Sequence, residues 1–569
     1  MERRPQLKIQ SLARSNFLRP LKSNKSSTRS RLPKKPEATV ENLFRIFTIP
    51  EDPNSTLGKI DKQISENLMG FLKEHIVTSD IQPSDLEKNF MTTDFPDDPI
   101  YVSDQAEFLR DKVVAQSVHT ASPTFIGHMT SALPYFMLPL AKIMIALNQN
   151  LVKIETSKAF TPLERQVIGI LHRLVYTKSE SFYKKHVQDP SKALGSFCSD
   201  GTIANITALW VALNRLLPQT KDLPGLANDG MYAAMDARNL KRVAVLVSKR
   251  GHYSLKKAAN ILGIGRDNLI SIPLDSHNKI SIPKLKIKIA ELKNEGVGIV
   301  AIVGIAGTTE TGNVDPLEEL ADICEENKIH FHADAAWGGP TLCSPKYGYK
   351  LKGIERADSV TFDAHKQLYV PVGAGIALFK NPDHLQLVQH YAEYIIRKGS
   401  RDLGRMTLEG SRPGMAMLIH SGLRIIGQKG YAMLIEMGIE KAAAFADLIR
   451  KQKDFELISE PELNLLTYRY VPLDIAERLK NGSIAEKQKL NDHVNRLTIS
   501  IQKEQREEGK SFVSRTMLEP ELYNNFPINV FRVVLANPLT TMEILEQILQ
   551  DQRRLAKKIL MADNSLMNS

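Results

Sequence analysis

Short β-branched segments alternate with helical segments from about residue 195 onward, and this alternation constrains the fold more than any other feature. Strands are expected at 243–247, 269–272, 298–303, 329–333, 359–362 and 375–379. Helices are expected between them at 202–217, 255–262, 283–294 and 317–327. Alternation of this kind predicts an α/β domain built on a mostly parallel sheet. Ligands of such sheets bind in the loops at the carboxyl ends of the strands, so we expect the chemistry there.

Further regions are expected on both sides of this domain. A mixed α+β segment is predicted at the end of the chain, with strands at 465–470 and 528–535 and helices at 488–503 and 541–560. The sequence contains no internal repeat. We therefore expect four parts: a basic, disordered tail at 1–38, a helical segment at 39–130, a large domain at 131–410 and a small domain at 411–569.

Residues 161–164 have the sequence pattern of a helix N-terminus. Thr161 is followed by Pro162 and, three residues after the threonine, by Glu164. A threonine cap, a proline at the first helical position and a glutamate two residues later form the pattern of a capping box. The pattern predicts a helix over 162–176.

The positive charge of the chain is concentrated in its first residues. The formal net charge is +11, and residues 1–36 contain 11 Lys and Arg against a single acid, Glu2. The rest of the chain is therefore almost neutral, which argues against a basic binding face for nucleic acid on the folded body. The tail lacks the apolar core of a secretory signal. A solvated extension is the favoured interpretation, and a transit peptide or an anion-binding arm are the alternatives.

The cysteine count indicates the redox compartment of the protein, and the hydropathy indicates whether the chain can span a membrane. The three cysteines, Cys198, Cys324 and Cys343, lack the spacing of a metal site, so free thiols in a reducing cytoplasm are expected. No run approaches the roughly 18 to 20 apolar residues that a membrane span needs. We therefore predict neither a metal ion nor a membrane partner.

The segment Ser199-Asp-Gly-Thr202 precedes the first helix of the α/β region. Small residues at the start of a helix let backbone N–H groups approach an anion, and the positive end of the helix dipole favours negative charge. Ser199 and Thr202 add hydroxyl groups. Alone this is an ordinary turn, but Ser199, Asp200, Gly201 and Thr202 together are a candidate phosphate cradle.

Four further polar groups follow expected strands. His252 follows 243–247, Thr308 follows 298–303, and Asp334 ends 329–333 with the small residue Ala336 beyond it. Lys366, after 359–362, is preceded by His365. A buried carboxylate such as Asp334 needs a positive partner, and a protonated pyridine nitrogen is one. An imidazole can stack on a planar ring, and a lysine amine that has lost its water can attack an aldehyde.

These groups are the parts that pyridoxal phosphate requires of a protein. The cofactor needs an anchor for its phosphate, an acid for its ring nitrogen and a lysine for its aldehyde. Any one of them alone would more often be an ordinary loop residue. Their occurrence together, on successive strand ends, predicts a pyridoxal phosphate site.

The motifs that carry these residues resemble those of the group II pyridoxal-phosphate-dependent amino-acid decarboxylases. The motifs are Gly-Thr-Ile-Ala-Asn205, His252-Tyr-Ser, Gly307-Thr-Thr, His332-Ala-Asp-Ala-Ala-Trp and Asp363-Ala-His-Lys366. More narrowly, the chain resembles the bacterial pyridoxal-dependent aspartate 1-decarboxylases, and it is also similar to glutamate decarboxylases. The resemblance implies fold type I, the aminotransferase-like fold of these pyridoxal phosphate enzymes.

The resemblance also implies roles for individual residues. Lys366 would hold the cofactor as a Schiff base, His252 would stack on its ring, and Asp334 would pair with the ring nitrogen. The turn at 199–202 and His365 would bind the phosphate, while Thr308 and Ala336 would contact the cofactor. Arg532 matches the arginine that faces the substrate carboxylate in glutamate-type enzymes. His128 stands where those enzymes carry glutamine, so it is a candidate substrate contact.

The activity implied is α-decarboxylation of an acidic amino acid. L-Aspartate, giving β-alanine, is the first expectation; L-glutamate and cysteine sulfinate are the alternatives within the family. Aminotransferase or lyase chemistry on the same fold is a rival, and a binding protein that acts through its basic tail is a rival of another class. By analogy with the family we expect a homodimer, with the segment 39–130 at its interface.

The proton donor for the step after CO2 loss is not identified by the sequence. Relatives carry a tyrosine on a loop between the lysine and the small domain. Here the stretch 397–411 contains no tyrosine, and Tyr391 and Tyr394 lie just before it.

Overall fold

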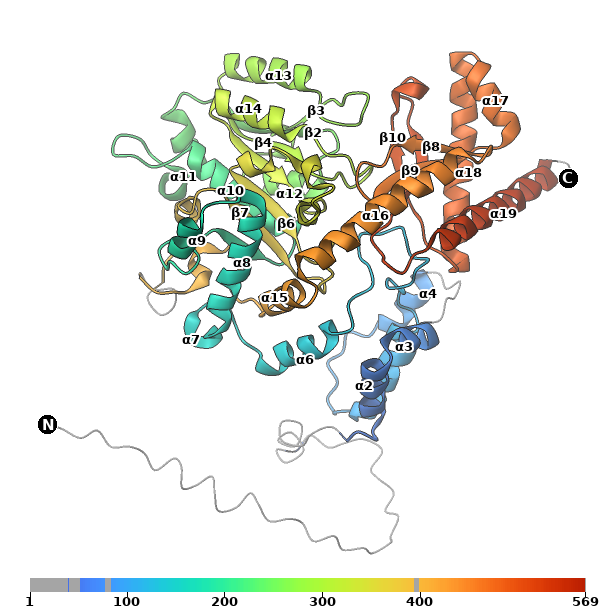
Figure 1. The fold of residues 1–569 in the computed structure, drawn as a ribbon, viewed down its shortest axis with the longest axis horizontal. Coiled ribbons are helices and arrows are strands. Elements are labelled where there is room, and N and C mark those ends of the chain that lie inside the picture. The colour runs from blue at the N-terminus through green and yellow to red at the C-terminus, as the bar shows by residue number, and fades with distance from the viewer. Residues whose placement is uncertain (1–38, 40–51, 77–82, 393–398, 568–569) are drawn as a thin grey trace, which may run out of the picture.

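A computed structural model describes residue 39 and residues 52–76, 83–392 and 399–567 of the chain. A seven-stranded sheet lies at the centre of the larger part (Figure 1), and its strands follow the order β1-β7-β6-β5-β4-β2-β3. The strands are β1 (Gly195–Cys198), β2 (Arg242–Ser248), β3 (Leu269–Ile272), β4 (Val297–Ile305), β5 (His330–Asp334), β6 (Ser359–Asp363) and β7 (Gly375–Phe379). Strands β2 to β6 pair in parallel, and β7 runs antiparallel to both of its neighbours, β6 and β1. The mostly parallel sheet of the predicted α/β fold is thus confirmed.

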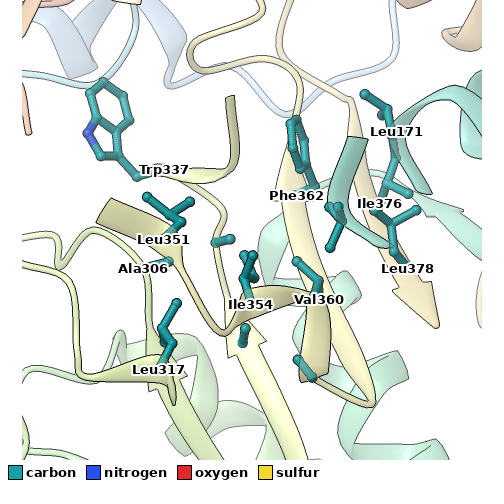
Figure 2. Packing of buried hydrophobic residues seen from close by; sticks show 14 of the residues in the cluster. Leu171, Ala306, Leu317, Trp337, Leu351, Ile354, Val360, Phe362, Ile376 and Leu378 are labelled. Carbon is teal, nitrogen blue, oxygen red and sulfur yellow. The ribbon is translucent and has the colours of Figure 1, made fainter. Parts of the chain in front are cut away.

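Helices cover both faces of this sheet because its strands are apolar on both sides. In β2, Val243, Val245 and Val247 pack in one cluster with α10 (Gly201–Leu216) and α12 (Tyr253–Ile261). The alternate residues Ala244 and Leu246 join the opposite cluster, which includes α8 (Phe160–Tyr176), α13 (Ile282–Asn294) and α14 (Leu317–Asn327). Such continuous apolar runs are expected for parallel strands buried on both faces. Figure 2 shows part of the second cluster, where Val360 and Phe362 of β6 lie beside Ile376 and Leu378 of β7.

The first strand was not predicted. Residues 195–198 were assigned to a loop, whereas the structure pairs them with β7, from Gly195 opposite Leu378 to Cys198 opposite Gly375. The segment is only four residues long and contains one β-branched or aromatic side chain, Phe197. Its strand conformation depends on pairing with a segment almost 180 residues later, which local preference does not report.

The C-terminal part contains a second, four-stranded antiparallel sheet with the order β10-β11-β9-β8. Strands β9 (Leu465–Tyr470) and β11 (Ile528–Val534) were predicted, and the outer strands β8 (Phe455–Ser459) and β10 (Ser514–Leu518) were not. Polar residues interrupt the apolar ones in both outer strands, Glu456 and Ser459 in β8 and Ser514 to Thr516 in β10, so neither strand has a continuous apolar signal. The helices of this part are α15 (Ala416–Ile425), α16 (Gly427–Arg450), α17 (Leu473–Asn481), α18 (Ile484–Glu508) and α19 (Met542–Met567).

Short helices precede the central sheet in the chain. They are α2 (Thr56–Glu66), α3 (Leu68–His75), α4 (Pro83–Glu87), α5 (Val102–Phe108), α6 (Met137–Leu147), α7 (Ile154–Ser157) and α9 (Glu180–His186), and α11 (Leu226–Asp236) follows α10. Figure 1 shows α2, α3 and α4 projecting from the body of the molecule. The predicted tail at 1–38 lies outside the described residues. Within the described ranges, each helix is too short or too polar to cross a membrane.

The predicted capping box is wrong. Helix α8 begins at Phe160, two residues before the predicted start, so Thr161 lies inside the helix. The Thr161 hydroxyl bonds the Ser157 hydroxyl at 2.6 Å. Glu164 is buried and accepts two hydrogen bonds from the Arg412 guanidinium, at 2.9 and 3.0 Å. The Glu164 carboxylate therefore pairs with a distant arginine and does not cap the start of the helix.

Three histidines buried in or beside the central sheet predict how stability responds to acid. Burial lowers the pKa of His172 and of His330 to about 3 and that of His332 to about 4. The folded state therefore favours the neutral imidazoles, and this contribution is complete above the unfolded pKa of about 6.5 and is lost as the pH falls toward 4. Burial raises the pKa of Asp315 to about 7, which acts in the opposite direction over part of this range.

Because the three histidines outweigh the single aspartate, we expect the Tm to decrease as the pH is lowered from 7 to 4.5. The substitution His172→Gln should reduce the fall, because each histidine contributes about 1.4 kcal/mol per pH unit in this window. Scanning calorimetry of both proteins across the range checks this. A Tm that is flat or rises toward pH 4.5 in the wild type would show that these histidines accept protons in the folded state.

Candidate active site

One pocket lies at the carboxyl ends of β2, β4, β5 and β6, as the α/β topology predicts. It collects residues from five segments that are far apart in sequence: 200–205, 250–253, 305–309, 334–337 and 363–366. Of the residues predicted for the site, those that line it are Asp200, Gly201, Thr202, His252, Asp334, Ala336, His365 and Lys366. The structure therefore brings together most of the side chains that the sequence singled out.

The start of α10 forms one wall of the pocket. Asp200 is the N-cap, and its carboxylate accepts a hydrogen bond from the Ile203 N–H at 2.9 Å. Gly201 packs so closely that an added Cβ would lie 2.6 Å from a carboxylate oxygen of Asp363, and a Cβ on Gly375 would lie 2.4 Å from the Asp200 carbonyl carbon. Glycine is thus needed on both segments for the helix start to approach the strand that precedes Lys366.

Lys366 projects into the pocket from the turn after β6. Its Nζ lies 2.9 Å from Oδ2 of Asp363, a carboxylate with 2% exposure whose Oδ1 has no partner among the described residues. The Nδ1 of His365 bonds the Ala374 carbonyl at 3.1 Å, which fixes the imidazole beside the same pocket. The lysine is therefore held at the pocket by one buried acid three residues earlier.

Asp334 ends β5 on the floor of the pocket, with 6% exposure. Its Oδ2 accepts a hydrogen bond from Nδ2 of Asn205 at 2.9 Å, and its Oδ1 accepts one from the Ala336 N–H at 3.2 Å. The side-chain Oδ1 of Asn205 in turn accepts a hydrogen bond from the Thr361 hydroxyl at 2.7 Å and lies 3.0 Å from Nε2 of His332. Two neutral donors thus hold a buried carboxylate without neutralising it.

His252 is tied into the same network. It caps α12, and its Nδ1 lies 2.8 Å from the Ser254 hydroxyl, which accepts a hydrogen bond from Asn205 at 3.1 Å. Burial lowers the pKa of His252, so the imidazole is neutral at physiological pH. Asn205 therefore links the carboxylate of Asp334 to the orientation of His252. Sequence reasoning gave this asparagine no role, although an asparagine among the apolar residues of the first helix of the α/β region was a usable signal.

Four predicted residues lie beside the pocket and do not line it. The Ser199 N–H donates to Glu409 at 2.9 Å, and the fully buried Thr308 hydroxyl bonds Thr311 at 2.9 Å, while its neighbour Thr309 faces the pocket. Arg532 is buried and donates to the carbonyls of Thr309 and Gly127. The surface of His128 is largely accessible, but its imidazole is partly enclosed; this enclosure, together with the positive charges of Arg532 and Lys366, lowers its pKa.

The family is established by comparison with known proteins. Residues 83–471 match the model of the pyridoxal-dependent decarboxylase conserved domain, which covers more than half of the chain. The chain belongs to the pyridoxal-dependent decarboxylase family. It is therefore a lyase of this family, a decarboxylase that uses pyridoxal phosphate, as the motifs predicted.

Individual relatives narrow the comparison. The chain is 57% identical over 520 residues to an aspartate 1-decarboxylase from Aliivibrio fischeri, with 91% of this chain and 95% of the relative covered. It is 26% identical over 458 residues to the human acidic amino acid decarboxylase GADL1, covering 79% and 81% of the two chains. The crystal structure of mouse CSAD in apo form has a TM-score of 0.75 at 22% identity and covers 88% of this chain and 98% of that one. This last likeness confirms the fold.

The pocket fits pyridoxal phosphate on its own geometry. Asp200, Gly201 and Thr202 bring the start of α10 to the pocket wall, where a phosphate would be favoured; Asp334 offers a buried carboxylate to a ring nitrogen, and Lys366 offers an amine to an aldehyde. Asp363 supplies a negative neighbour for the lysine. Among the described residues, no group of three His, Cys, Asp or Glu side chains is placed to hold a metal ion.

Proposed function

We propose that this chain removes the α-carboxyl group of L-aspartate as CO2 and releases β-alanine. The observation that carries the proposal is the gathering of Lys366, Asp334 and His252 in one pocket of a pyridoxal-dependent decarboxylase. The 57% identity to an aspartate 1-decarboxylase supports aspartate as the substrate. β-Alanine is a building block for pantothenate, so the reaction would serve cofactor supply.

Bound in this pocket, pyridoxal phosphate supplies an aldehyde for the substrate amine and a conjugated ring that accepts the electrons of the broken bond. Lys366 would hold that aldehyde through its amine. The backbone of Asp200 to Thr202 at the start of α10 would hold the phosphate, with His365 lining the same pocket. Ala336, next to the Asp334 carboxylate, leaves room for the flat ring.

Asp334 would hold a proton on the ring nitrogen. Its two oxygens are held by Asn205 and Ala336, so the carboxylate has a fixed position in the pocket. His252, fixed through Ser254, would stack on the ring and help to orient the substrate carboxylate. Arg532 and His128, which lie beside the pocket and do not line it, are further candidates for contact with the substrate.

A substrate panel tests the proposal. We expect the cofactor-loaded enzyme to show a kcat/KM for L-aspartate about 10- to 200-fold above that for L-glutamate, since one methylene in a fitted pocket is worth about 1–3 kcal/mol. Cysteine sulfinate, which matches aspartate in length, is the stringent competitor. Measuring the rate of product formation with each of the three amino acids identifies the preferred substrate. A preference for glutamate or for cysteine sulfinate would overturn the assignment of aspartate.

We further infer a homodimer in a reducing, cytoplasmic compartment. Apolar side chains are exposed over the N-terminal helical region and α6, including Phe95 at 94%, Met91 at 72% and Ile145 at 69%. Large apolar side chains exposed in this number favour association with another chain. The three cysteines are buried free thiols, as a reducing compartment allows. Light scattering of the native protein and of Phe95→Asp measures the mass; a wild-type monomer would contradict the inference.

A further inference from the structure

Arg250 lies in the loop after β2, two residues before His252, and the decarboxylase family match assigns it no role. Its side chain lines the same pocket as His252 and Lys366. Only 9% of the residue is exposed, so its guanidinium stands where water is largely excluded. A buried charge in a pocket needs an explanation, because removing it from water is costly unless a partner compensates.

The guanidinium of Arg250 lacks such a partner in the protein. Within the part of the chain that the structure describes, no carbonyl, hydroxyl or carboxylate accepts a hydrogen bond from it, and its Nε is enclosed and unpartnered. Glu310 and Glu519 are the acids whose charges act on it, and neither lies within the 4.0 Å of an ion pair. Glu519 is engaged by Lys249 instead.

Arg532, the arginine that the sequence pointed to, is in the opposite situation. Its Nε donates to the Thr309 carbonyl, and its Nη1 lies 3.2 Å from the Gly127 carbonyl and 3.3 Å from the Ser514 hydroxyl. These contacts join three segments of the chain around the pocket. Arg532 therefore uses its Nε and Nη1 donors within the protein. No described residue accepts a hydrogen bond from the Arg250 guanidinium, so its donors remain available to a ligand.

We infer that Arg250 binds the side-chain carboxylate of the substrate and is the residue that selects an acidic amino acid. This rests on the proposed function and adds the residue that reads the substrate's second negative charge. A planar guanidinium offers two parallel N–H donors to a carboxylate, and an amide or an apolar group cannot satisfy them equally. The free cation thereby favours a four-carbon dicarboxylic substrate over its neutral analogues.

The test compares a dicarboxylate with its monoamide. Succinate carries both carboxylates of aspartate and lacks the amine, and succinamate replaces one carboxylate by an amide. Calorimetry with the cofactor-loaded enzyme should give tighter binding of succinate in the wild type and equal binding of the two ligands in Arg250→Met. Lys249→Met, which removes a neighbouring surface charge, should keep the wild-type preference. Unchanged cofactor absorbance shows that the pocket is intact.

Turnover gives the second readout. In Arg250→Met, kcat/KM for L-aspartate should fall by roughly 10²- to 10³-fold, because a charge-assisted, desolvated pair is lost. Arg250→Lys should recover part of the loss. A variant that keeps the succinate preference, or that loses both ligands equally, would overturn the inference.

A further variant separates substrate binding from a structural pairing with Glu310, whose Oε2 is also enclosed and unpartnered. If Arg250 serves the substrate, Glu310→Gln should leave the preference for succinate over succinamate in place. If Glu310→Gln loses the preference for succinate as fully as Arg250→Met does, Arg250 acts by pairing with Glu310, and the inference is wrong. A wild-type enzyme that binds succinate through Arg250 but releases no CO2 from aspartate would refute the proposed function and leave this inference standing.

Discussion

Replacing Lys366 by alanine should reduce decarboxylation by about four orders of magnitude or more, because the amine that holds the cofactor and exchanges with the substrate is lost. The pocket itself should survive, since the lysine is the only side chain removed and its partner Asp363 remains buried behind Gly201. The variant should also lose the absorbance that marks the cofactor joined to a lysine.

A chemical readout makes the Lys366 prediction independent of activity. Reduction of the loaded wild type with borohydride, followed by peptide mass spectrometry, should place the cofactor on the peptide that contains Lys366. Lys380→Ala is a matched control, because Lys380 follows the antiparallel strand β7 and its Nζ contacts the Arg356 carbonyl away from the pocket. A label on another lysine, or full activity in Lys366→Ala, would refute the assignment.

Replacing Asp334 by asparagine should lower kcat/KM by about 10²- to 10⁴-fold, since breaking a buried charge pair costs about 3–5 kcal/mol. The substitution keeps the volume but removes the charge that holds a proton on the ring nitrogen. It would also turn an amide N–H toward the Asn205 amide, which now donates to Oδ2. Cofactor affinity should fall with the rate, and titration of the apoprotein measures this separately.

Asp315 provides the matched control for Asp334. It is equally buried, and its two oxygens accept hydrogen bonds from the Ile280 and Ile305 N–H groups, each at 2.8 Å, away from the pocket. Asp315→Asn should lower the Tm, because a buried donor loses its acceptor at a cost of about 1–3 kcal/mol, and should leave the kcat/KM of the folded enzyme unchanged. Equal kinetic losses in both variants would mean that Asp334 acts on the fold.

The sequence predicted the architecture where the signal was local and repeated. Strands β2 to β5 alternate with helices. The residues that follow the parallel strands β2, β5 and β6, among them His252, Asp334 and Lys366, meet in one pocket because parallel strands end at one edge. Strand β1 was missed, since its conformation depends on pairing with β7. The Thr161 capping pattern failed because Glu164 pairs with Arg412, 248 residues away.

The supporting contacts of the site could not be read from the sequence. Asn205 joins Asp334, His252 and Thr361 only after α10 packs against the sheet. Arg250 and Arg532 differ in which of their donors the protein uses, and that difference exists only in three dimensions. Of the two tyrosines before the loop, Tyr391 donates its hydroxyl hydrogen to the Gln389 side chain and does not line the pocket, and Tyr394 lies outside the described residues.

The central claim is that this pocket breaks the bond between the α-carbon of L-aspartate and its α-carboxyl group. The most direct measurement supplies the loaded enzyme with L-aspartate carrying carbon-14 in either the α- or the β-carboxyl group and follows both gas and product. The account predicts that all α-label is released as CO2, with one equivalent of β-alanine, and that the β-label stays in the β-alanine. Release of the β-label with formation of alanine, or formation of a keto acid without CO2, would contradict it.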